Sequence, residues 1–340
     1  MLEEFINLAK SNVDLTSEQM QQAILWMLAG QLSDEEIGKL LVALREKGEA
    51  VSELVGAARA MRLMMSPIRT HRGGLLDTCG TGGDGARTFN ISTATAIVAA
   101  AAGANVAKHG NRKITSATGS ADVLSELGVK IDASREVVES CLNELGICFC
   151  FAPLLHPAMK HVANVRRSLA FPTLFNYLGP LCNPAGAVFQ VIGVGKEELQ
   201  TKIAATLIQL PIEAAIVVRG EDGLDEVTLS ADTHVLLIQQ GMLTQTTWTP
   251  ESFGLSKINS DDLVVDGPAE SALAITKVLK GNRGPRRDIV LANAAAGLWI
   301  SGITHSLIDA VAKAEQAIDS GRAAELLKSL CARSQSITTS

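Results

Sequence analysis

The first seventy residues carry apolar side chains at the spacing of amphipathic helices. Ser33 and Glu36 have the spacing of a capping box, in which the hydroxyl accepts a hydrogen bond from a free backbone N–H and the carboxylate reaches back. Apolar residues then recur three and four positions apart until the stop signal at Gly48. Residues 16–30 and 52–65 repeat the pattern. We therefore predict packed helices, whose apolar stripes fit packing within the chain and also suit a subunit interface.

Near Gly73 the pattern changes to short apolar runs that alternate with helical segments. Residues 75–78 predict a strand, which a glycine-rich loop, an alanine-rich helix at 92–102 and a second strand at 105–108 follow. Strand, loop, helix and strand form a βαβ unit, which implies parallel pairing. We expect further strands at 147–152, 188–194 and 214–219, and further helices at 120–127, 137–145, 196–210 and through most of 268–329.

These elements predict an α/β fold with a small N-terminal all-α domain at residues 1–72 and a larger α/β domain with a mostly parallel central sheet at 73–340. The length of 340 residues exceeds a typical single core, which also favours two domains. Hydrophobic residues make up 47% of the chain, so the composition is far from that of a disordered protein.

Charge and cysteine usage exclude several classes of protein. The net charge of -6 argues against a general nucleic-acid binder, which needs a basic stripe to displace counterions from phosphates. The six cysteines form no C-x-x-C pair, so buried free thiols are favoured over a zinc site or disulfides. The acidic start lacks a secretory core, and no apolar run nears the roughly 20 residues that span a bilayer. We expect a soluble, cytoplasmic protein.

The loop from Gly80 to Gly85 reads G-T-G-G-D-G and matches the dinucleotide pattern G-x-G-x-x-G. That pattern requires a helix that begins at the loop and an acidic residue about 20 positions later. Here the loop continues through Phe89, and Asn105 stands twenty residues past Gly85. No G-K-[ST] follows, so the Walker phosphate loop is excluded as well. The small residues still allow backbone N–H groups to approach an anion closely, so we predict an anion-binding loop.

Two polar segments follow the glycine loop and suit the same kind of ligand. Asn90–Thr93 opens the next helix, where its side chains can act as N-caps and also border an anion or magnesium site. Lys108–Arg112 follows the second strand, at the edge where open α/β sheets bind ligands. A solvated basic turn is the alternative for that segment. The hydroxyl-rich loop at residues 115–120 extends the polar region.

Two segments further along add acids and arginines. Asp225-Glu226 follows the strand at 214–219 and precedes the alternating run 227–229, so we place the acid pair at a strand edge. Two adjacent carboxylates suit magnesium that carries a phosphate ligand. Residues 156–167 predict one helix with His156 at its start and Arg166-Arg167 near its end. Arginine can grip a carboxylate at two points, although a surface arginine pair is the alternative.

Together these segments resemble the anthranilate phosphoribosyltransferase family. Seven stretches match the family in order and in motif, and the stretch A-L-R-E-K-G-E at 43–49 adds a match in the helical region. The likeness therefore covers nearly the whole chain. The seven stretches are D-T-C-G-T-G-G-D at 77–84, T-F-N-I-S-T at 88–93, K-H-G-N-R at 108–112, G-S-A-D at 119–122, 156–167, 175–184 and D-G-L-D-E at 222–226.

The resemblance implies a fold and a reaction. The fold is that of nucleoside phosphorylases and phosphoribosyltransferases, with part of 156–187 joining the helical domain and a homodimer formed through the helical part. The reaction is a glycosyltransferase step of L-tryptophan biosynthesis, in which anthranilate displaces pyrophosphate from 5-phosphoribosyl 1-pyrophosphate and gives N-(5-phosphoribosyl)anthranilate. The resemblance also implies two Mg²⁺ ions per subunit. The implied partners are small-molecule substrates, with no nucleic acid and no membrane.

Residue by residue, the resemblance assigns three sets of side chains. Anthranilate is expected at Gly80, His109, Asn111, His156 and Arg166, and magnesium at Ser92, Asp225 and Glu226. No catalytic base is assigned, because the amine of anthranilate is itself the nucleophile. The phosphorylated sugar is expected at Gly80, Gly83, Asp84, Thr88, Asn90, Ile91, Ser92, Thr93, Lys108, His109, Gly110, Asn111, Arg112, Lys113, Ile114, Thr115, Ser116 and Ser120.

Departures from the family pattern lie outside the expected magnesium ligands. Lys113 comes early and Ala117 stands where a basic residue is usual; family members often have arginine near Pro172, and Arg219 stands where histidine is common. A pyrimidine-nucleoside phosphorylase and a non-enzymatic nucleic-acid-binding relative share the architecture. Residues 156–167 and the acid pair favour the transferase over the phosphorylase, and the net charge of -6 disfavours the nucleic-acid binder.

Overall fold

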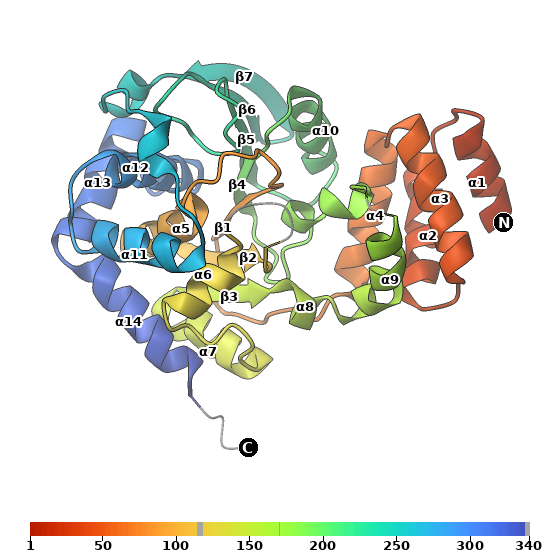
Figure 1. Cartoon of the computed structure of the whole chain (residues 1–340), viewed down its shortest axis with the longest axis horizontal. Helices are drawn as coiled ribbons and strands as arrows, with labels where there is room; N and C mark the ends of the chain where they lie inside the picture. Colours follow the sequence, from red (N-terminus) through yellow and green to blue (C-terminus); the bar gives the residue numbers. More distant parts are fainter. Residues whose placement is uncertain (114–117, 170, 337–340) are drawn as a thin grey trace.

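The computed structural model describes residues 1–113, 118–169 and 171–336, with a helical part beside an α/β part (Figure 1). The capping box predicted at Ser33 forms, and a second one forms at Thr16, where the similar segment 16–30 begins. The N–H of Ser33 donates to Oε2 of Glu36 at 2.8 Å, and the N–H of Glu36 donates back to Oγ of Ser33 at 3.3 Å. The helices of this part are α1 (Leu2–Lys10), α2 (Ser17–Leu28), α3 (Asp34–Lys47) and α4 (Val51–Met64).

The α/β part is built on a seven-stranded sheet in the order β3-β2-β1-β4-β5-β6-β7. The first five strands of this order pair in parallel, which confirms the predicted fold class, and β6 and β7 extend the sheet as an antiparallel hairpin. The strands are β1 (Leu75–Gly80), β2 (Asn105–Gly110), β3 (Ile147–Phe151), β4 (Phe189–Gly193), β5 (Ala214–Gly220), β6 (Thr233–Gln239) and β7 (Met242–Trp248).

Helices cover both faces of the sheet. Successive residues of β5 alternate between two apolar clusters: Ile216 belongs to the cluster that includes α5 and α12, whereas Val217 belongs to the cluster that includes α10 and the helical part. This period of two is what a strand buried on both faces requires. The helices of the α/β part are α5 (Ile91–Ala101), α6 (Ser120–Glu126), α7 (Arg135–Leu145), α8 (Ala152–Leu155), α10 (Glu197–Leu207), α11 (Pro268–Leu279), α12 (Pro285–Ile300), α13 (Leu307–Asp319) and α14 (Arg322–Ser334).

The strand order places a ligand site at one edge of the sheet. From β1 the chain passes through α5 to β2 on one side, whereas β4 pairs with β1 on the other side. Such a reversal opens a crevice at the carboxyl ends of the strands, where open α/β sheets bind ligands. Glycines end the four central strands there: Gly80, Gly110, Gly193 and Gly220.

Two sequence predictions about local structure are wrong. Residues 227–229 form no strand, because the buried side chain of Asn293 takes the place of a strand partner: its Oδ1 accepts from the N–H of Val227 and its Nδ2 donates to the carbonyl of Val227. The predicted helix at 156–167 begins only at Lys160, as α9 (Lys160–Ser168). His156 lies before it, between α8 and a 3₁₀ turn, since Pro157 has no N–H to continue α8.

Cysteine usage follows the prediction of free thiols. All six cysteines are free, and Cys141, Cys148, Cys150 and Cys182 are buried. Burial raises the pKa of Cys182 to about 12, so this thiol stays protonated at neutral pH. None of the helices in the described ranges is long and apolar enough to cross a bilayer.

Candidate functional site

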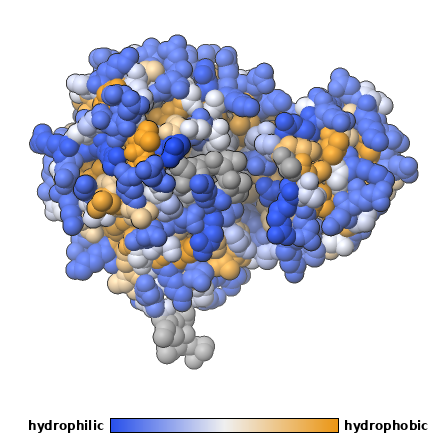
Figure 2. Space-filling model, viewed as in Figure 1, coloured by the Kyte–Doolittle hydropathy of each residue, from blue (hydrophilic) through white to orange (hydrophobic). Residues whose placement is uncertain are grey.

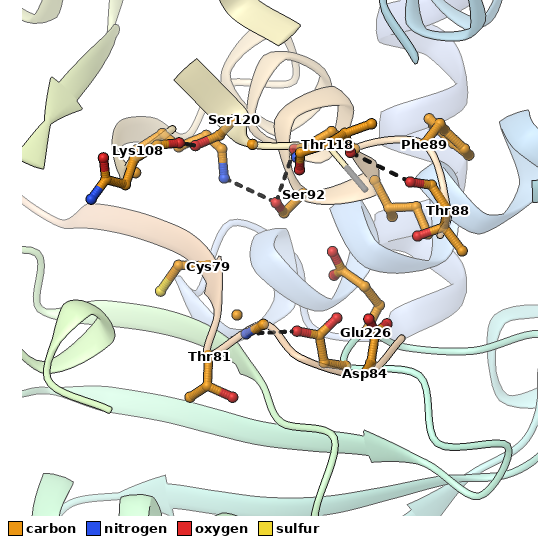
Figure 3. Close-up of a pocket in the computed structure, with 18 of the residues that line it drawn as sticks. Cys79, Thr81, Asp84, Thr88, Phe89, Ser92, Lys108, Thr118, Ser120 and Glu226 are labelled. Carbon is orange, nitrogen blue, oxygen red and sulfur yellow. Dashed lines mark hydrogen bonds between the residues drawn. The ribbon is translucent and has the colours of Figure 1, made fainter. Parts of the chain in front are cut away.

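A polar cavity of about 210 Å³ lies at the carboxyl ends of β1 and β2 (Figure 3). The glycine loop, the start of α5, the end of β2 and the acid pair after β5 all border it. Segments as distant as residues 80 and 226 therefore meet at one site. Of the residues expected to hold the sugar phosphate or magnesium, those that line the cavity are Gly80, Asp84, Thr88, Asn90, Ile91, Ser92, Lys108, His109, Gly110, Asn111, Arg112, Ser120, Asp225 and Glu226.

Three expected residues among the described ranges do not line the polar cavity. The side chain of Thr93 is fully buried, and its N–H donates to Oδ1 of Asn90, the N-cap of α5. Gly83 and Lys113 lie outside the lining, and the N–H of Lys113 donates to Oδ2 of Asp122 at 2.8 Å. The expected residues Ile114, Thr115 and Ser116 lie outside the described residues.

The cavity also has lining residues that were not assigned from the sequence. They are Cys79, Thr81, Gly82, Arg87, Phe89, Thr118 and Gly119. Most of them are neighbours of assigned positions, and the hydroxyl-rich loop already pointed to Thr118 and Gly119. Arg87 had no local signal, because a single charged residue in an exposed loop is usually a solvated surface residue.

The glycine loop packs directly against the carboxylate of Asp225. The N–H of Gly82 donates to Oδ2 of Asp225 at 3.0 Å. A Cβ added at Gly80 would lie 2.7 Å from the same oxygen, so only glycine fits there without a shift. The φ angles of Gly82, Gly83 and Gly85 are +68°, +85° and +74°, in the left-handed region that favours glycine.

Burial makes the acid pair costly to ionise. It raises the pKa of Asp225 well above its ordinary value, and the charges of Asp84 and Glu226 add to the effect. Burial likewise raises the pKa of Glu226 to about 8, with Lys108 opposing and Asp84 adding to the rise. A divalent cation would offset this crowding of negative charge, and oxygen ligands suit magnesium.

Magnesium would need more ligands than these side chains supply. Within the described residues, no three acidic, histidine or cysteine side chains converge on one point that could hold a metal ion. Magnesium usually keeps several waters and takes one or two carboxylates together with substrate phosphates. Asp225, Glu226 and the hydroxyl of Ser92 therefore fit a metal that arrives with a phosphorylated substrate.

Buried polar contacts hold the end of β2 in place. Asp77 is fully buried, and its Oδ1 accepts from the N–H of His109 at 3.0 Å while its Oδ2 accepts from Nδ2 of Asn183 at 2.8 Å. The ammonium of Lys108 donates to the carbonyl of Thr78 at 2.6 Å and to Oγ of Ser92 at 3.1 Å. These contacts fix β2 to β1 and to the start of α5, so the cavity wall is preorganised.

A second, largely apolar cavity of about 470 Å³ lies next to the polar one. We call it the apolar cavity. The two cavities share Cys79, Gly80, Thr81, His109, Gly110 and Asn111. All five residues expected at the anthranilate site line it: Gly80, His109, Asn111, His156 and Arg166. Met61 and Pro153 line it without a local signal in the sequence, whereas Met159, Lys160, Phe175 and Leu178 come from the matching stretches 156–167 and 175–184.

Two histidines line the apolar cavity without adding charge to it. The rings of His109 and His156 lie 5.1 Å apart between centroids. Burial lowers the pKa of His109 to about 4 and that of His156 to about 3, so both are neutral at pH 7. Nδ1 of His109 lies 3.0 Å from the carbonyl oxygen of Gly179, so in the neutral ring Nδ1 carries the proton and donates it.

Arg166 is a half-buried cation in this apolar setting. Its guanidinium lies 5.5 Å from the ring centroid of Phe175, and burial lowers its pKa. No carboxylate of the described residues forms an ion pair with it. Arginine stays charged even when buried, so this position favours an anionic ligand.

Comparisons with known proteins match both parts of the chain. Residues 72–324 match the glycosyl transferase family, a/b domain, and residues 3–64 match the glycosyl transferase family, helical bundle domain. The chain is 53% identical over 322 residues to the anthranilate phosphoribosyltransferase of Rhodopirellula baltica, covering 95% of this chain and 94% of that protein. It is 47% identical over 322 residues to the anthranilate phosphoribosyltransferase of Methanosarcina barkeri, covering 94% of this chain and 87% of that protein.

Solved structures resemble the whole fold. The anthranilate phosphoribosyltransferase of Thermus thermophilus superposes with a TM-score of 0.91 at 41% identity, covering 98% of this chain and 99% of that one. The anthranilate phosphoribosyltransferase of Saccharomyces cerevisiae in complex with PRPP and Mg gives a TM-score of 0.91 at 29% identity, covering 99% and 98%. The likeness therefore extends across both parts of the molecule.

Proposed function

This chain belongs to the anthranilate phosphoribosyltransferase family, and from that premise we propose how its two cavities divide the reaction. The enzyme transfers the phosphoribosyl group of 5-phosphoribosyl 1-pyrophosphate to the amine of anthranilate, giving N-(5-phosphoribosyl)anthranilate and pyrophosphate in L-tryptophan biosynthesis. The polar cavity binds phosphoribosyl pyrophosphate with magnesium. The apolar cavity binds anthranilate.

One observation carries this division: the two cavities share a wall. Gly80 and Gly110–Asn111 border both, so a sugar in the polar cavity and an amine in the apolar cavity would lie side by side. An aromatic ring suits the apolar lining, and a carboxylate suits the guanidinium of Arg166, which pairs with no carboxylate among the described residues. A nucleoside phosphorylase would instead bring phosphate and a nucleoside, which supply no aromatic carboxylate for Arg166.

The chemistry needs positioning and charge stabilisation more than a catalytic base. The bond from C1 of the ribose to pyrophosphate breaks, the bond from C1 to the amine nitrogen forms, and the nitrogen loses a proton. Holding both substrates at the shared wall makes the displacement effectively unimolecular. The positive end of the α5 dipole and the backbone of the glycine loop border the polar cavity and can stabilise the leaving pyrophosphate.

We propose that Ser92, Asp225 and Glu226 hold two Mg²⁺ ions per subunit, together with the substrate. When bound, magnesium supplies positive charge that stabilises the leaving pyrophosphate. The crowded, buried carboxylates support this role, since their charges otherwise oppose one another. Mass spectrometry of the protein with magnesium and phosphoribosyl pyrophosphate under native conditions tests the number of ions.

A direct assay tests the function itself. Anthranilate fluorescence is expected to disappear when the protein, phosphoribosyl pyrophosphate and magnesium are mixed, and pyrophosphate should appear in equal amount. Omitting magnesium or phosphoribosyl pyrophosphate should keep the fluorescence constant. Constant fluorescence in the complete mixture, with folded protein, would refute the proposal.

Arg166→Ala is expected to raise KM for anthranilate about ten- to one-hundred-fold with a smaller change in kcat. The reason is that a charge-assisted hydrogen bond to the carboxylate, worth about 1.5–3 kcal/mol, is lost. Initial rates at varied anthranilate measure the effect. Arg167→Ala is the matched control, because Arg167 is exposed, lies outside the cavity and donates to Asn164. Equal KM values for anthranilate in Arg166→Ala and wild type would show that Arg166 does not bind the carboxylate of anthranilate.

We propose that residues 1–72 and part of 156–187 form one helical domain, which mediates a homodimer, and that 73–340 form the other domain. Helix α9 supports this division because it packs on α2 and α3, with Val162 and Val165 in their apolar cluster. Val13 and Leu63 are exposed on the helical part, and Figure 2 shows hydrophobic areas on this part among hydrophilic ones. Light scattering after size-exclusion chromatography tests the dimer, and a single-chain mass would contradict it.

We also assign the reaction to the cytoplasm. The six free cysteines support this assignment, since disulfides are rare in that compartment and common in oxidising ones. Fractionation of cells that express the tagged protein tests it, and recovery outside the cytoplasm would contradict it.

A further inference from the structure

Arg87 is a cationic lining residue of the polar cavity with an unusual backbone. Its φ is +53°, in the left-handed region, where a residue with a Cβ is disfavoured and glycine or asparagine is more common. Its side chain is 62% exposed and borders the cavity. Burial of the side chain does not compensate for the disfavoured backbone conformation, because Arg87 is exposed. The presence of arginine at a position that suits glycine therefore favours a functional role for its guanidinium.

Contacts with residues 263–266 hold this strained backbone. The carbonyl of Arg87 accepts from the N–H of Val265 at 3.0 Å, and the N–H of Phe89 donates to the carbonyl of Leu263 at 2.9 Å. Between them, Thr88 and Val264 form an isolated antiparallel bridge. The direction in which the side chain of Arg87 leaves the loop is therefore fixed by a neighbouring segment.

The other strong cations of the cavity are already engaged. The ammonium of Lys108 is buried and donates to Thr78 and Ser92. The guanidinium of Arg112 pairs with Asp122 at 3.1 Å, and its carbon lies 5.9 Å from the ring centroid of Phe151. Neither is free to follow an incoming phosphate without breaking these contacts.

The partner of Arg87 is easier to exchange. Its Nη2 lies 3.0 Å from Oδ1 of Asp266, whose side chain is 90% exposed. An ion pair between two exposed groups contributes little to stability. A phosphoryl group carries more charge than a carboxylate and matches the guanidinium at two points, so it can displace Asp266.

We propose that Arg87 binds a phosphoryl group of phosphoribosyl pyrophosphate, and that Asp266 holds the guanidinium at the rim of the polar cavity until the substrate arrives. The inference rests on the proposed function, because it requires a phosphorylated ligand in this cavity. The phosphoryl group belongs either to the 5-phosphate or to the pyrophosphate. Arg87 thereby adds a binding contact that the glycine loop alone would not provide.

Titration calorimetry with phosphoribosyl pyrophosphate and magnesium tests the proposal. Arg87→Gly removes the guanidinium and relieves the backbone strain, so Kd should rise about ten- to one-hundred-fold while the melting temperature stays equal or rises. Arg87→Lys keeps the charge without the planar fork and should give an intermediate Kd. The KM for anthranilate should not change. Arg69→Gly, at an exposed arginine that lines neither cavity, is the matched control.

The variant Asp266→Asn distinguishes two roles of Arg87: direct binding of the substrate, and stabilisation of the loop through its ion pair with Asp266. If Asp266 only holds Arg87 ready, this variant should bind the substrate as tightly as wild type or more tightly. An equal loss of affinity in Asp266→Asn and Arg87→Gly would overturn the proposal, since the ion pair would then act by holding the loop in place and not by contacting the substrate. A Kd for Arg87→Gly within about two-fold of wild type would overturn it too.

Two smaller probes identify the phosphoryl group. Ribose 5-phosphate reports on the 5-phosphate, and inorganic pyrophosphate with magnesium reports on the other end. Arg87→Gly should weaken one of them, and unchanged affinity for both would contradict the proposed contact. If wild type binds phosphoribosyl pyrophosphate without consuming anthranilate, the proposed function fails, whereas the affinity comparison still decides the role of Arg87.

Discussion

Replacing Asp225 and Glu226 together with alanine is expected to lower magnesium-dependent turnover by on the order of a thousand-fold or more. Both carboxylates border the polar cavity and are proposed to hold the metal that stabilises the leaving pyrophosphate. Because burial already penalises their charged forms, their removal should not destabilise the fold. Initial rates across a magnesium titration measure the loss, and circular dichroism with thermal unfolding reports on the fold.

A matched control is available in a second adjacent acid pair. Asp261 and Asp262 are exposed and lie outside both cavities, so their double alanine variant should keep wild-type turnover and magnesium dependence. Turnover near the wild-type rate in the Asp225 and Glu226 variant would show that the metal is held elsewhere. A collapse of the melting temperature would instead assign the pair a structural role.

Gly193→Ala is expected to lower turnover about one-hundred-fold, although residue 193 lies in no recognised motif. Gly193 ends β4, pairs with Gly80, and its carbonyl accepts from the N–H of Thr81 at 2.9 Å. A Cβ at this position would overlap the backbone carbonyl of Asp225. Since backbone atoms cannot rotate away, either the glycine loop or the acid pair must shift, and both border the polar cavity. The same overpacking should lower stability by about 1–3 kcal/mol.

Gly73→Ala is the control for Gly193→Ala, because Gly73 lies just before β1, the strand that pairs with β4. A Cβ at Gly73 would meet no atom within 4 Å, and this residue is exposed. The turnover of the Gly73→Ala variant and its free energy of unfolding in urea should equal those of the wild-type protein. If Gly193→Ala also retained wild-type turnover, the close approach of β4 to Asp225 would have no part in ordering the site.

Local patterns predicted much of the fold correctly. The capping boxes at Thr16 and Ser33 involve residues three positions apart, so their geometry is set by one turn of helix. The run from β1 through α5 to β2 was predictable because two short apolar pairs, Leu75-Leu76 and Val106-Ala107, flank a glycine-rich loop and an alanine-rich helix. The hairpin β6–β7 was not predicted. Its outer strand is exposed at nearly every residue and carries threonine and glutamine, so no apolar alternation marks it.

The residues of the site were likewise predicted in part by local motifs and in part wrongly. Motifs placed Ser92, Lys108 and Asp225 at one edge of the sheet, because the carboxyl ends of parallel strands meet there. They gave His156 a helical position that the structure corrects, since Pro157 has no N–H to continue α8 past His156. They also included Thr93, whose side chain is buried away from the cavity, because a helix turns successive residues to different faces.

The sequence by itself determined the fold class, the family and the residue types of the anion site, because each depends on short segments whose order along the chain is preserved. Only the tertiary structure decided which of these residues meet. It placed Gly193 against Asp225, Asn293 beside Val227, and Arg87 at the cavity rim beside Asp266. These contacts join residues 32 (193 to 225), 66 and 179 positions apart, so no local periodicity predicts them. They arise only when the sheet and its helices pack.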